Sequence, residues 1–181
     1  MNLRKLNIYV TAGIMITFII HAVSGGLRLA GASTEPATIS AWLCVAFICV
    51  HMVIGTILTA RTLKARKLSG AGYFRENSEF WTRRISGFVI LIPLAMHLAI
   101  FMQSSDSAYR LQAFTAGRLI SQVLLVAAIA LHVLTNIRPS MISLGVRDHK
   151  AFRIDLLLIL SVLLLLMGIA FVIYYIRWMR F

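Results

Sequence analysis

Five apolar runs of about twenty residues recur along the chain, separated by short polar segments that are rich in Lys and Arg. A bilayer core about 30 Å thick needs about 20 apolar residues in a helix that rises about 1.5 Å per residue. Each run is therefore long enough to cross a membrane. The predicted spans lie near Ile8–Leu29, Ala37–Ala60, Ile85–Met102, Phe114–Leu134 and Leu156–Trp178. We predict an all-α integral membrane bundle of five transmembrane helices, forming a single domain over residues 1–181.

Composition agrees with this pattern. The chain is 60% hydrophobic and 13% charged, whereas soluble domains are about 45–50% apolar and about 25% charged. These values exclude a soluble enzyme, a disordered tail and a secreted disulfide scaffold. Cys44 and Cys49 lie five residues apart in one run, on different faces of a helix, so we expect small buried residues without a disulfide. We expect the first run, which ends in Gly-Gly-Leu-Arg, to be a retained span rather than a cleaved signal peptide.

Basic residues are concentrated in alternate loops. Thirteen fall in the amino-terminal segment and in the second and fourth loops, and five fall on the other side. The positive-inside rule therefore predicts a cytoplasmic amino terminus. The net charge of +12 is assigned to these loops and not to a nucleic-acid surface. Tyr174, Tyr175 and Trp178 are expected to form an aromatic belt at the outer end of the last span.

Four of the five histidines lie inside predicted spans, one in each of the first four. Ionisable residues at such depths are costly and mark function by default. Counted at 1.5 Å per residue, His21 and His97 both lie roughly 20 Å from the cytoplasmic face. His51 lies roughly 14 Å from that face and His132 roughly 3–8 Å from it. The depths therefore predict two pairs: His21 with His97 toward the outside, and His51 with His132 toward the cytoplasm.

Two histidines that face each other between helices are what a six-coordinate haem iron requires. No CxxCH motif occurs, so any haem is expected to be the non-covalent b type. Glycines near the predicted ligands would leave room for the macrocycle: Gly25, Gly26, Gly55, Gly87 and Gly117. Interhelical hydrogen bonding and a proton relay are the alternatives for the histidines. A zinc or di-metal site is disfavoured, because no carboxylate or thiolate cluster accompanies them.

Two haems at two depths would conduct electrons across part of the membrane. The chain has no nucleotide-binding fingerprint and no cysteine cluster, so electrons would be exchanged with partner subunits and with a quinone in the bilayer. The basic segment from Arg61 to Arg84 could bind a peripheral subunit, or it could bind anionic lipid headgroups.

The segment Gly72–Gly87, which runs into the span of His97, resembles the cytochrome b anchor of succinate dehydrogenases and fumarate reductases. Those anchors carry Arg-x-[Ser/Thr]-Gly where a haem-bearing helix begins, and Arg84-Ile85-Ser86-Gly87 is similar to it. Five spans with histidines in four of them resemble the single-chain, two-haem version. In that family the first and third spans share one haem, and the second and fourth share the other.

The resemblance implies His21, His97, His51 and His132 as ligands of two haem b groups, and Ser86 as a further cofactor-binding residue. It implies a non-catalytic electron-transfer subunit of a bacterial or archaeal cytoplasmic membrane. Its partners would be a flavoprotein, an iron–sulfur subunit, membrane lipid and a quinone, menaquinone being favoured. One departure is Ala130, at a position where some menaquinone-linked members have a proton-transferring Glu.

Other polar residues are candidates for the haem propionates and the quinone. Guanidinium groups pair well with carboxylates, which favours Arg83, Arg84 and Arg138 at the inner level and Arg28 and Arg118 at the outer level; snorkelling is the alternative. Polar residues that could meet a quinone near the outer face are Glu35, Ser40, Arg28, Gln103 and Gln122. Glu35 precedes Pro36, and a carboxylate at a helix start is also explained by the helix dipole.

Two other functions stay open. A cytochrome b subunit of a hydrogenase or formate dehydrogenase would have comparable haems and a different partner. A haem-free transporter or scaffold is the second; broken helices are typical of transporters. Of the three prolines, only Pro93 is expected to interrupt a span, and Pro139 is expected to lie in the fourth loop. A kink at Pro93, one turn before His97, could widen a haem slot.

Overall fold

The computed structural model describes residues 2–33, 37–69, 78–102, 113–143, 145 and 149–180 of the 181-residue chain. Within these ranges every regular element is helical. The helices are α1 (Leu3–Ala30), α2 (Thr38–Ser69), α3 (Ser78–Val89), α4 (Leu91–Phe101), α5 (Ala116–Ser143) and α6 (His149–Met179). The helices α3 and α4 together form one span, so the described residues contain five helical segments long and apolar enough to cross a membrane. The predicted all-α architecture is confirmed, with five helices of the length and apolarity that a membrane span requires.

Each span is longer than its apolar run, and the main extension lies at the same end of the bundle. The helix α2 continues nine residues past the predicted limit at Ala60, and α3 begins seven residues before Ile85. These additions are the basic segments between the runs. Hydropathy ends where a chain would leave hydrocarbon, but backbone hydrogen bonding continues through Lys and Arg, which are good helix formers. The predicted boundaries therefore mark the apolar segments and not the ends of the helices.

The third span is broken at Ile90, between α3 and α4. Pro93 has no backbone N–H to donate to the carbonyl of Val89 four residues earlier, which is where α3 ends. Helical hydrogen bonds resume with the N–H of Leu94, which donates to the carbonyl of Ile90 over 3.0 Å. The predicted interruption of this span at Pro93 is confirmed. Pro139, in contrast, lies inside α5, so its predicted place in a loop is wrong: the helix continues past it.

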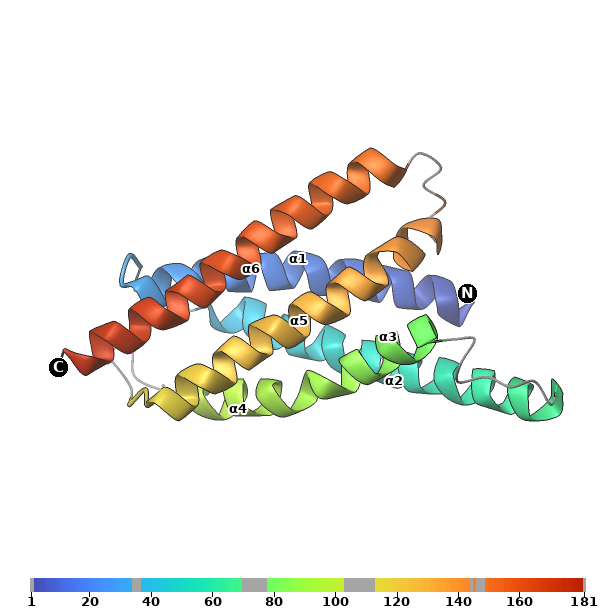
Figure 1. Ribbon diagram of the computed structural model, residues 1–181, viewed down its shortest axis with the longest axis horizontal. Helices are drawn as coiled ribbons and strands as arrows, with labels where there is room; N and C mark the ends of the chain where they lie inside the picture. The colour runs from blue at the N-terminus through green and yellow to red at the C-terminus, as the bar shows by residue number, and fades with distance from the viewer. Residues whose placement is uncertain are drawn as a thin grey trace.

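The bundle is built from two groups of helices (Figure 1). The helix α2 packs against α1, while α3 and α4 pack against α5. The helix α6 contacts both α1 and α5 and so joins the groups. Among the described residues, α2 has no backbone packing against α3, α4 or α5, and α1 has none against α3 or α4. Apart from a small contact between α1 and α5, the two groups therefore face each other through side chains.

The two ends of the bundle differ in charge. The amino terminus, the end of α2, the start of α3, the end of α5 and the start of α6 lie at one end (Figure 1). This end, which we call the basic end, carries basic residues of the described helices, among them Arg4, Arg61, Arg83, Arg138 and Arg153. The carboxy terminus lies at the opposite end, which we call the outer end. The separation of charge matches the sequence pattern, and the compartment that each end faces stays a prediction.

Aromatic side chains form a buried cluster at the outer end of the bundle. Tyr174 is 2% exposed and Phe114 is fully buried, and their ring centroids lie 5.0 Å apart. Tyr175 and Trp178 are partly buried against the same cluster. The predicted aromatic belt is therefore wrong for Tyr174: the crossing of α6 over α1 and α5 turns this side chain into the bundle. Position along a span does not determine which way a side chain faces.

The last helix also caps the first. Gly31 follows α1 with φ of 81°, the left-handed conformation that glycine adopts without strain. Arg177 donates to the carbonyl of Leu29 over 2.8 Å, which satisfies one of the free carbonyls at the helix end. Cys44 is buried and Cys49 is exposed, and both are free thiols. They lie on different faces as predicted, but Cys49 is not the buried residue that was expected.

Candidate functional site: two histidine pairs

Two histidine pairs lie inside the bundle. The ring centroids of His21 and His97 are 6.1 Å apart, and those of His51 and His132 are 6.4 Å apart. The ring planes are nearly perpendicular, at 88° and 80°. These are the pairs that depth counting predicts, and we call them the outer pair and the inner pair. Their role as metal ligands stays a prediction.

Each pair bridges helices whose backbones do not pack together. His21 comes from α1 and His97 from α4, while His51 comes from α2 and His132 from α5. Neither α1 and α4 nor α2 and α5 have backbone contacts among the described residues. The rings therefore meet across the boundary between the two helix groups. A flat cofactor ligated by both rings of a pair would lie at this boundary.

The outer pair is held by an amide and by aromatic rings. Nδ1 of His97 lies 2.7 Å from Oε1 of Gln122, a side chain with no solvent exposure. Phe101 and Phe171 flank the same ring, with centroid distances of 5.0 Å and 6.3 Å. Nδ1 of His21 is buried without a hydrogen-bond partner among the described residues, although the backbone of Ala37 is near enough to interact with this ring.

The inner pair is held by hydroxyls. Oγ of Ser86 lies 3.0 Å from Nδ1 of His132, and Oγ1 of Thr11 lies 3.4 Å from Nδ1 of His51. Ser86 is 3% exposed. Arg84 lies near enough to both rings for their charges to interact. The surroundings of the two pairs therefore differ, although the four rings are chemically the same.

These hydrogen bonds determine which ring nitrogen carries the proton. Ser86 donates its hydroxyl to the carbonyl of Arg83, and Thr11 donates to that of Asn7. Each hydroxyl can then only accept from its histidine. An amide Oε1 is an acceptor in any case. His51 and His97 therefore carry the proton on Nδ1, which leaves the lone pair of Nε2 for a metal. Nδ1 of His132 also lies 3.4 Å from the amide nitrogen of Asn136, which is a donor, so its contacts fit either tautomer. A metal-bound histidine almost always donates its other N–H in this way.

The levels of the two pairs can be measured along two helices independently. On α1, Thr11 contacts the inner pair and His21 belongs to the outer pair, ten residues further on. On α5, Gln122 contacts the outer pair and His132 belongs to the inner pair, again ten residues further on. Ten helical residues span about 15 Å. The two pairs are therefore stacked along the bundle, about 15 Å apart.

Glycines near the histidines either allow helices to pack closely or leave space around the histidine rings. A Cβ added at Gly26 would meet Cε of Met167 at 2.6 Å, so this glycine allows α1 and α6 to pack closely. A Cβ added at Gly25 would have no neighbouring atom within 4 Å. At Gly87 the nearest atom would be Cε1 of His132, at 3.2 Å. Gly25 therefore borders open space one turn after His21, and Gly87 provides space for the His132 ring.

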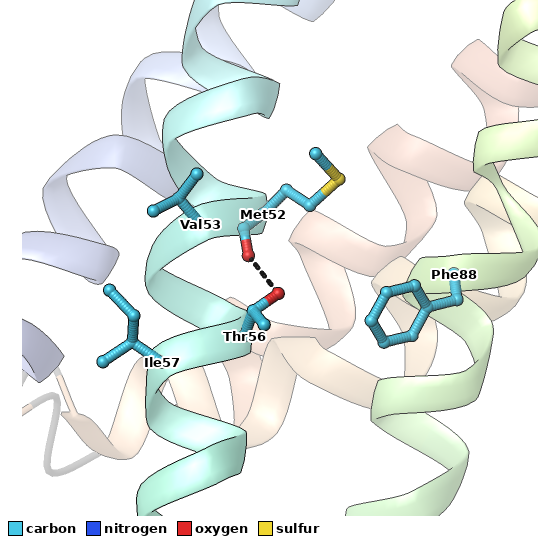
Figure 2. Close-up of a pocket in the computed structure, with 5 residues that line it drawn as sticks. All are labelled: Met52, Val53, Thr56, Ile57 and Phe88. Atoms are coloured by element: carbon cyan, nitrogen blue, oxygen red, sulfur yellow. Dashed lines mark hydrogen bonds between the residues drawn. The ribbon is translucent and has the colours of Figure 1, made fainter.

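An open apolar hollow lies between α2 and α3 (Figure 2), lined by exposed side chains and by none of the four paired histidines. Its volume is about 260 Å³. Four of its lining residues follow His51 on α2, namely Met52, Val53, Thr56 and Ile57. The fifth is Phe88 on α3. Phe88 directly follows Gly87, which contacts the His132 ring. The hollow is smaller than the roughly 300–1,000 Å³ of pockets that enclose a ligand, and we assign it no part in the histidine sites.

Other predicted site residues lie elsewhere or make local contacts. Arg83 forms a 3.4 Å ion pair with Glu79. Arg118 donates to the carbonyl of Ala113, and Ser40 donates to that of Ala37 over 3.0 Å. Arg138 is exposed on α5, and Arg28 is half-buried in the last turn of α1. Glu35 and Gln103 lie outside the described residues.

Three features of the site were missed by sequence reasoning. Thr11 was not considered, because a threonine forty residues from its histidine carries no sequence signal. Gln122 was considered only for the quinone, whereas both ends of its amide bond to protein atoms. The third feature is Asn136, which donates to the carbonyl of His132 over 2.7 Å. A polar residue one turn after a buried histidine is a signal that could have found Asn136.

The donor set fits a metal bound between two imidazoles. With a metal–nitrogen bond of about 2.0 Å and about 1.1 Å from nitrogen to ring centre, two opposed rings have centroids about 6.2 Å apart. The observed distances are 6.1 and 6.4 Å. Within the described part of the chain, no cluster of three or more His, Cys, Asp or Glu is found. Two protein ligands per metal suit a macrocycle that supplies the remaining four.

Comparisons with protein-family models, with curated proteins and with solved structures find no match for this chain.

Proposed function

We propose that this chain is a membrane-anchor subunit that binds two b-type haems and passes electrons between a cytoplasmic partner and membrane quinone. The partner would be the flavin and iron–sulfur part of a fumarate reductase or succinate dehydrogenase. One observation carries the proposal: four histidines from four spans meet as two stacked pairs at 6.1 and 6.4 Å. A histidine that only joins two helices by a hydrogen bond has no reason to face a second histidine.

The chain's own residues would hold each cofactor. His21 and His97 would bind the outer haem, and His51 and His132 the inner one, each through Nε2. Haem supplies reversible one-electron chemistry at iron when it is bound. Arg84, beside the inner pair, would neutralise a propionate, because a guanidinium binds a carboxylate through two parallel hydrogen bonds. All four histidines are partly buried between the helices.

The basic end would face the cytoplasm and bind the partner subunit or anionic lipid. It carries Arg61, Lys64 and Lys67 on the extended end of α2, where the helix runs beyond its apolar segment. Long positively charged helix ends suit an acidic protein surface or lipid phosphates. A quinone would reach the haems from the bilayer, since it is the electron carrier that is soluble there. A hydrogenase or formate dehydrogenase partner would use the same haems and this same end.

Purification from native membranes in mild detergent tests the proposed role. We expect tagged chain to co-purify with subunits that contain flavin and iron–sulfur clusters, and a reduced quinone analogue to reduce its haem. A matched variant replaces Arg61, Lys64 and Lys67 with Gln, which should lower partner recovery and leave haem content unchanged. Haem reduction without any flavin-containing partner would contradict the anchor role and favour another cytochrome b complex.

A further inference from the structure

We propose that Gln122 is a positioning residue for the outer pair: its amide holds His97 with the proton on Nδ1 and sets how strongly Nε2 donates to a bound metal. This inference rests on the proposed function, because it presupposes a metal between His21 and His97. It goes further by assigning the electronic properties of the outer centre to a side chain that does not touch the metal.

The bond between Gln122 and His97 is the shortest of the four side-chain contacts that the structure gives to the ring nitrogens of these histidines. It measures 2.7 Å, against 3.0 Å for Ser86 and 3.4 Å for Thr11. Gln122 has no solvent exposure. A hydrogen bond in such surroundings is stronger than in water, and water does not compete for it. Gln122 therefore has more influence on its histidine than either hydroxyl has on its own.

Ser121 determines which way the amide of Gln122 points. Oγ of Ser121 donates to the carbonyl of Arg118 over 2.7 Å and accepts from Nε2 of Gln122 over 3.0 Å. The amide nitrogen thus faces Ser121, and Oε1 faces His97. A reversed amide would present N–H groups to Nδ1 and place the proton of His97 on Nε2, where a metal would bind. The order Ser121–Gln122–His97 therefore selects the tautomer that can ligate.

Aromatic rings keep His97 oriented toward His21. Phe101 is tilted at 50° to the His97 ring, and Phe171 meets that ring edge-on at 84°. The imidazole is confined by these rings, so a change at Gln122 would alter its electron donation more than its position. Confinement of the ring therefore separates an electronic role of Gln122 from a purely structural role.

The chemical consequence has a definite sign. A stronger acceptor on Nδ1–H makes the imidazole more basic and favours the oxidised metal. Removing the acceptor as Gln122→Leu should raise the midpoint potential of the outer centre, and a carboxylate as Gln122→Glu should lower it. A tenfold change in the relative stability of the two oxidation states corresponds to about 59 mV for one electron. We expect a shift of about this size in each direction.

The test is an optical redox titration of the full-length chain in lipid nanodiscs. The outer centre is identified as the one that remains in a His51→Ala background, where Gln122→Leu and Gln122→Glu should shift it in opposite directions. Ser86→Ala in the chain with all four histidines is the reciprocal control, and it should shift the midpoint potential of the inner centre alone. Shifts in the same direction, or no shift in either variant, would overturn the inference and leave the proposed function intact.

A second variant covers the event that a change at Gln122 prevents folding. Ser121→Ala keeps Gln122 and releases only the orientation of its amide, so the potential should rise, by less than in Gln122→Leu. An unchanged potential in Ser121→Ala would then contradict the inference. A folded wild-type chain that binds no haem would instead overturn the proposed function, and this inference with it.

Discussion

The outer and inner pairs each consist of two imidazole rings in nearly the same arrangement, with centroids 6.1 and 6.4 Å apart. Their surroundings are different. The outer pair has a buried amide and two phenylalanine rings, and the inner pair has two hydroxyls and the guanidinium of Arg84. Ligand identity sets what can be bound, and the surrounding residues set the properties of what is bound. The two pairs therefore form an internal comparison within one chain.

Removing a histidine should have the largest effect on this comparison. His21→Ala is expected to lower haem content from two per chain to one, with loss of the outer centre, because one axial ligand no longer retains the cofactor. His51→Ala should remove the inner centre in the same way. Haem quantified per polypeptide checks both variants, and His149→Ala, in the segment outside the apolar spans, is the matched control. Retention of two haems in either ligand variant would contradict the pairing.

The neighbouring glycines Gly25 and Gly26 test whether open space beside the outer pair serves the cofactor. Gly25→Leu should leave the fold intact, because no atom lies within 4 Å of its added Cβ, yet lower haem occupancy at the outer centre by filling the space beside His21. Gly26→Leu should destabilise the bundle by about 1–3 kcal/mol, because its Cβ would overlap Met167. Thermal unfolding followed by circular dichroism, with haem quantification, separates these outcomes. Equal behaviour of the two variants would argue against open space at Gly25 serving the cofactor.

The charge of Arg84 distinguishes the inner pair. Arg84→Gln should lower the midpoint potential of the inner centre by about 59 mV, a tenfold change in equilibrium, because a nearby cation disfavours the more positive oxidised state. The outer centre, at the other level, should move far less. Arg83→Gln is the neighbouring control, since Arg83 pairs with Glu79 at the helix surface. Equal shifts at both centres in a redox titration would contradict a local effect.

The smallest effect is expected at Thr11. Its bond to His51 is longer than those of Ser86 and Gln122 to their histidines, at 3.4 Å, and a hydrogen bond of this kind contributes about 0.5–1.5 kcal/mol. Thr11→Val keeps the side-chain shape and should shift the inner centre by less than Ser86→Ala does. Redox titration of the two variants side by side measures the order. A larger shift for Thr11→Val would mean that Ser86 is not the main partner of the inner pair.

The features that the sequence predicted well depend on distance along the chain. The length of an apolar run identifies a span, and residue counts place His21 level with His97, because a helix has a fixed rise per residue. The break before Pro93 also follows from local backbone chemistry. These properties belong to single helices and do not require knowledge of how the helices pack.

The features that were missed depend on rotation of the helices about their axes. Tyr174 turns inward to meet Phe114, and Gln122 turns toward His97 instead of toward a quinone site. The side of a helix that faces its neighbour is set by packing over the whole bundle, which a nearly uniformly apolar run does not encode. Thr11 and His51 illustrate the same limit, since only the contact between α1 and α2 brings them together.

The most direct test of the two paired sites is the haem content of the purified wild-type chain. A reduced-minus-oxidised visible spectrum, a haem-to-polypeptide ratio and an electron paramagnetic resonance spectrum can be recorded on one sample. We predict two b-type haems per chain, both low-spin with two imidazole ligands. A well-folded helical preparation without haem would contradict the account, and the histidine pairs would then be explained by packing or by proton transfer.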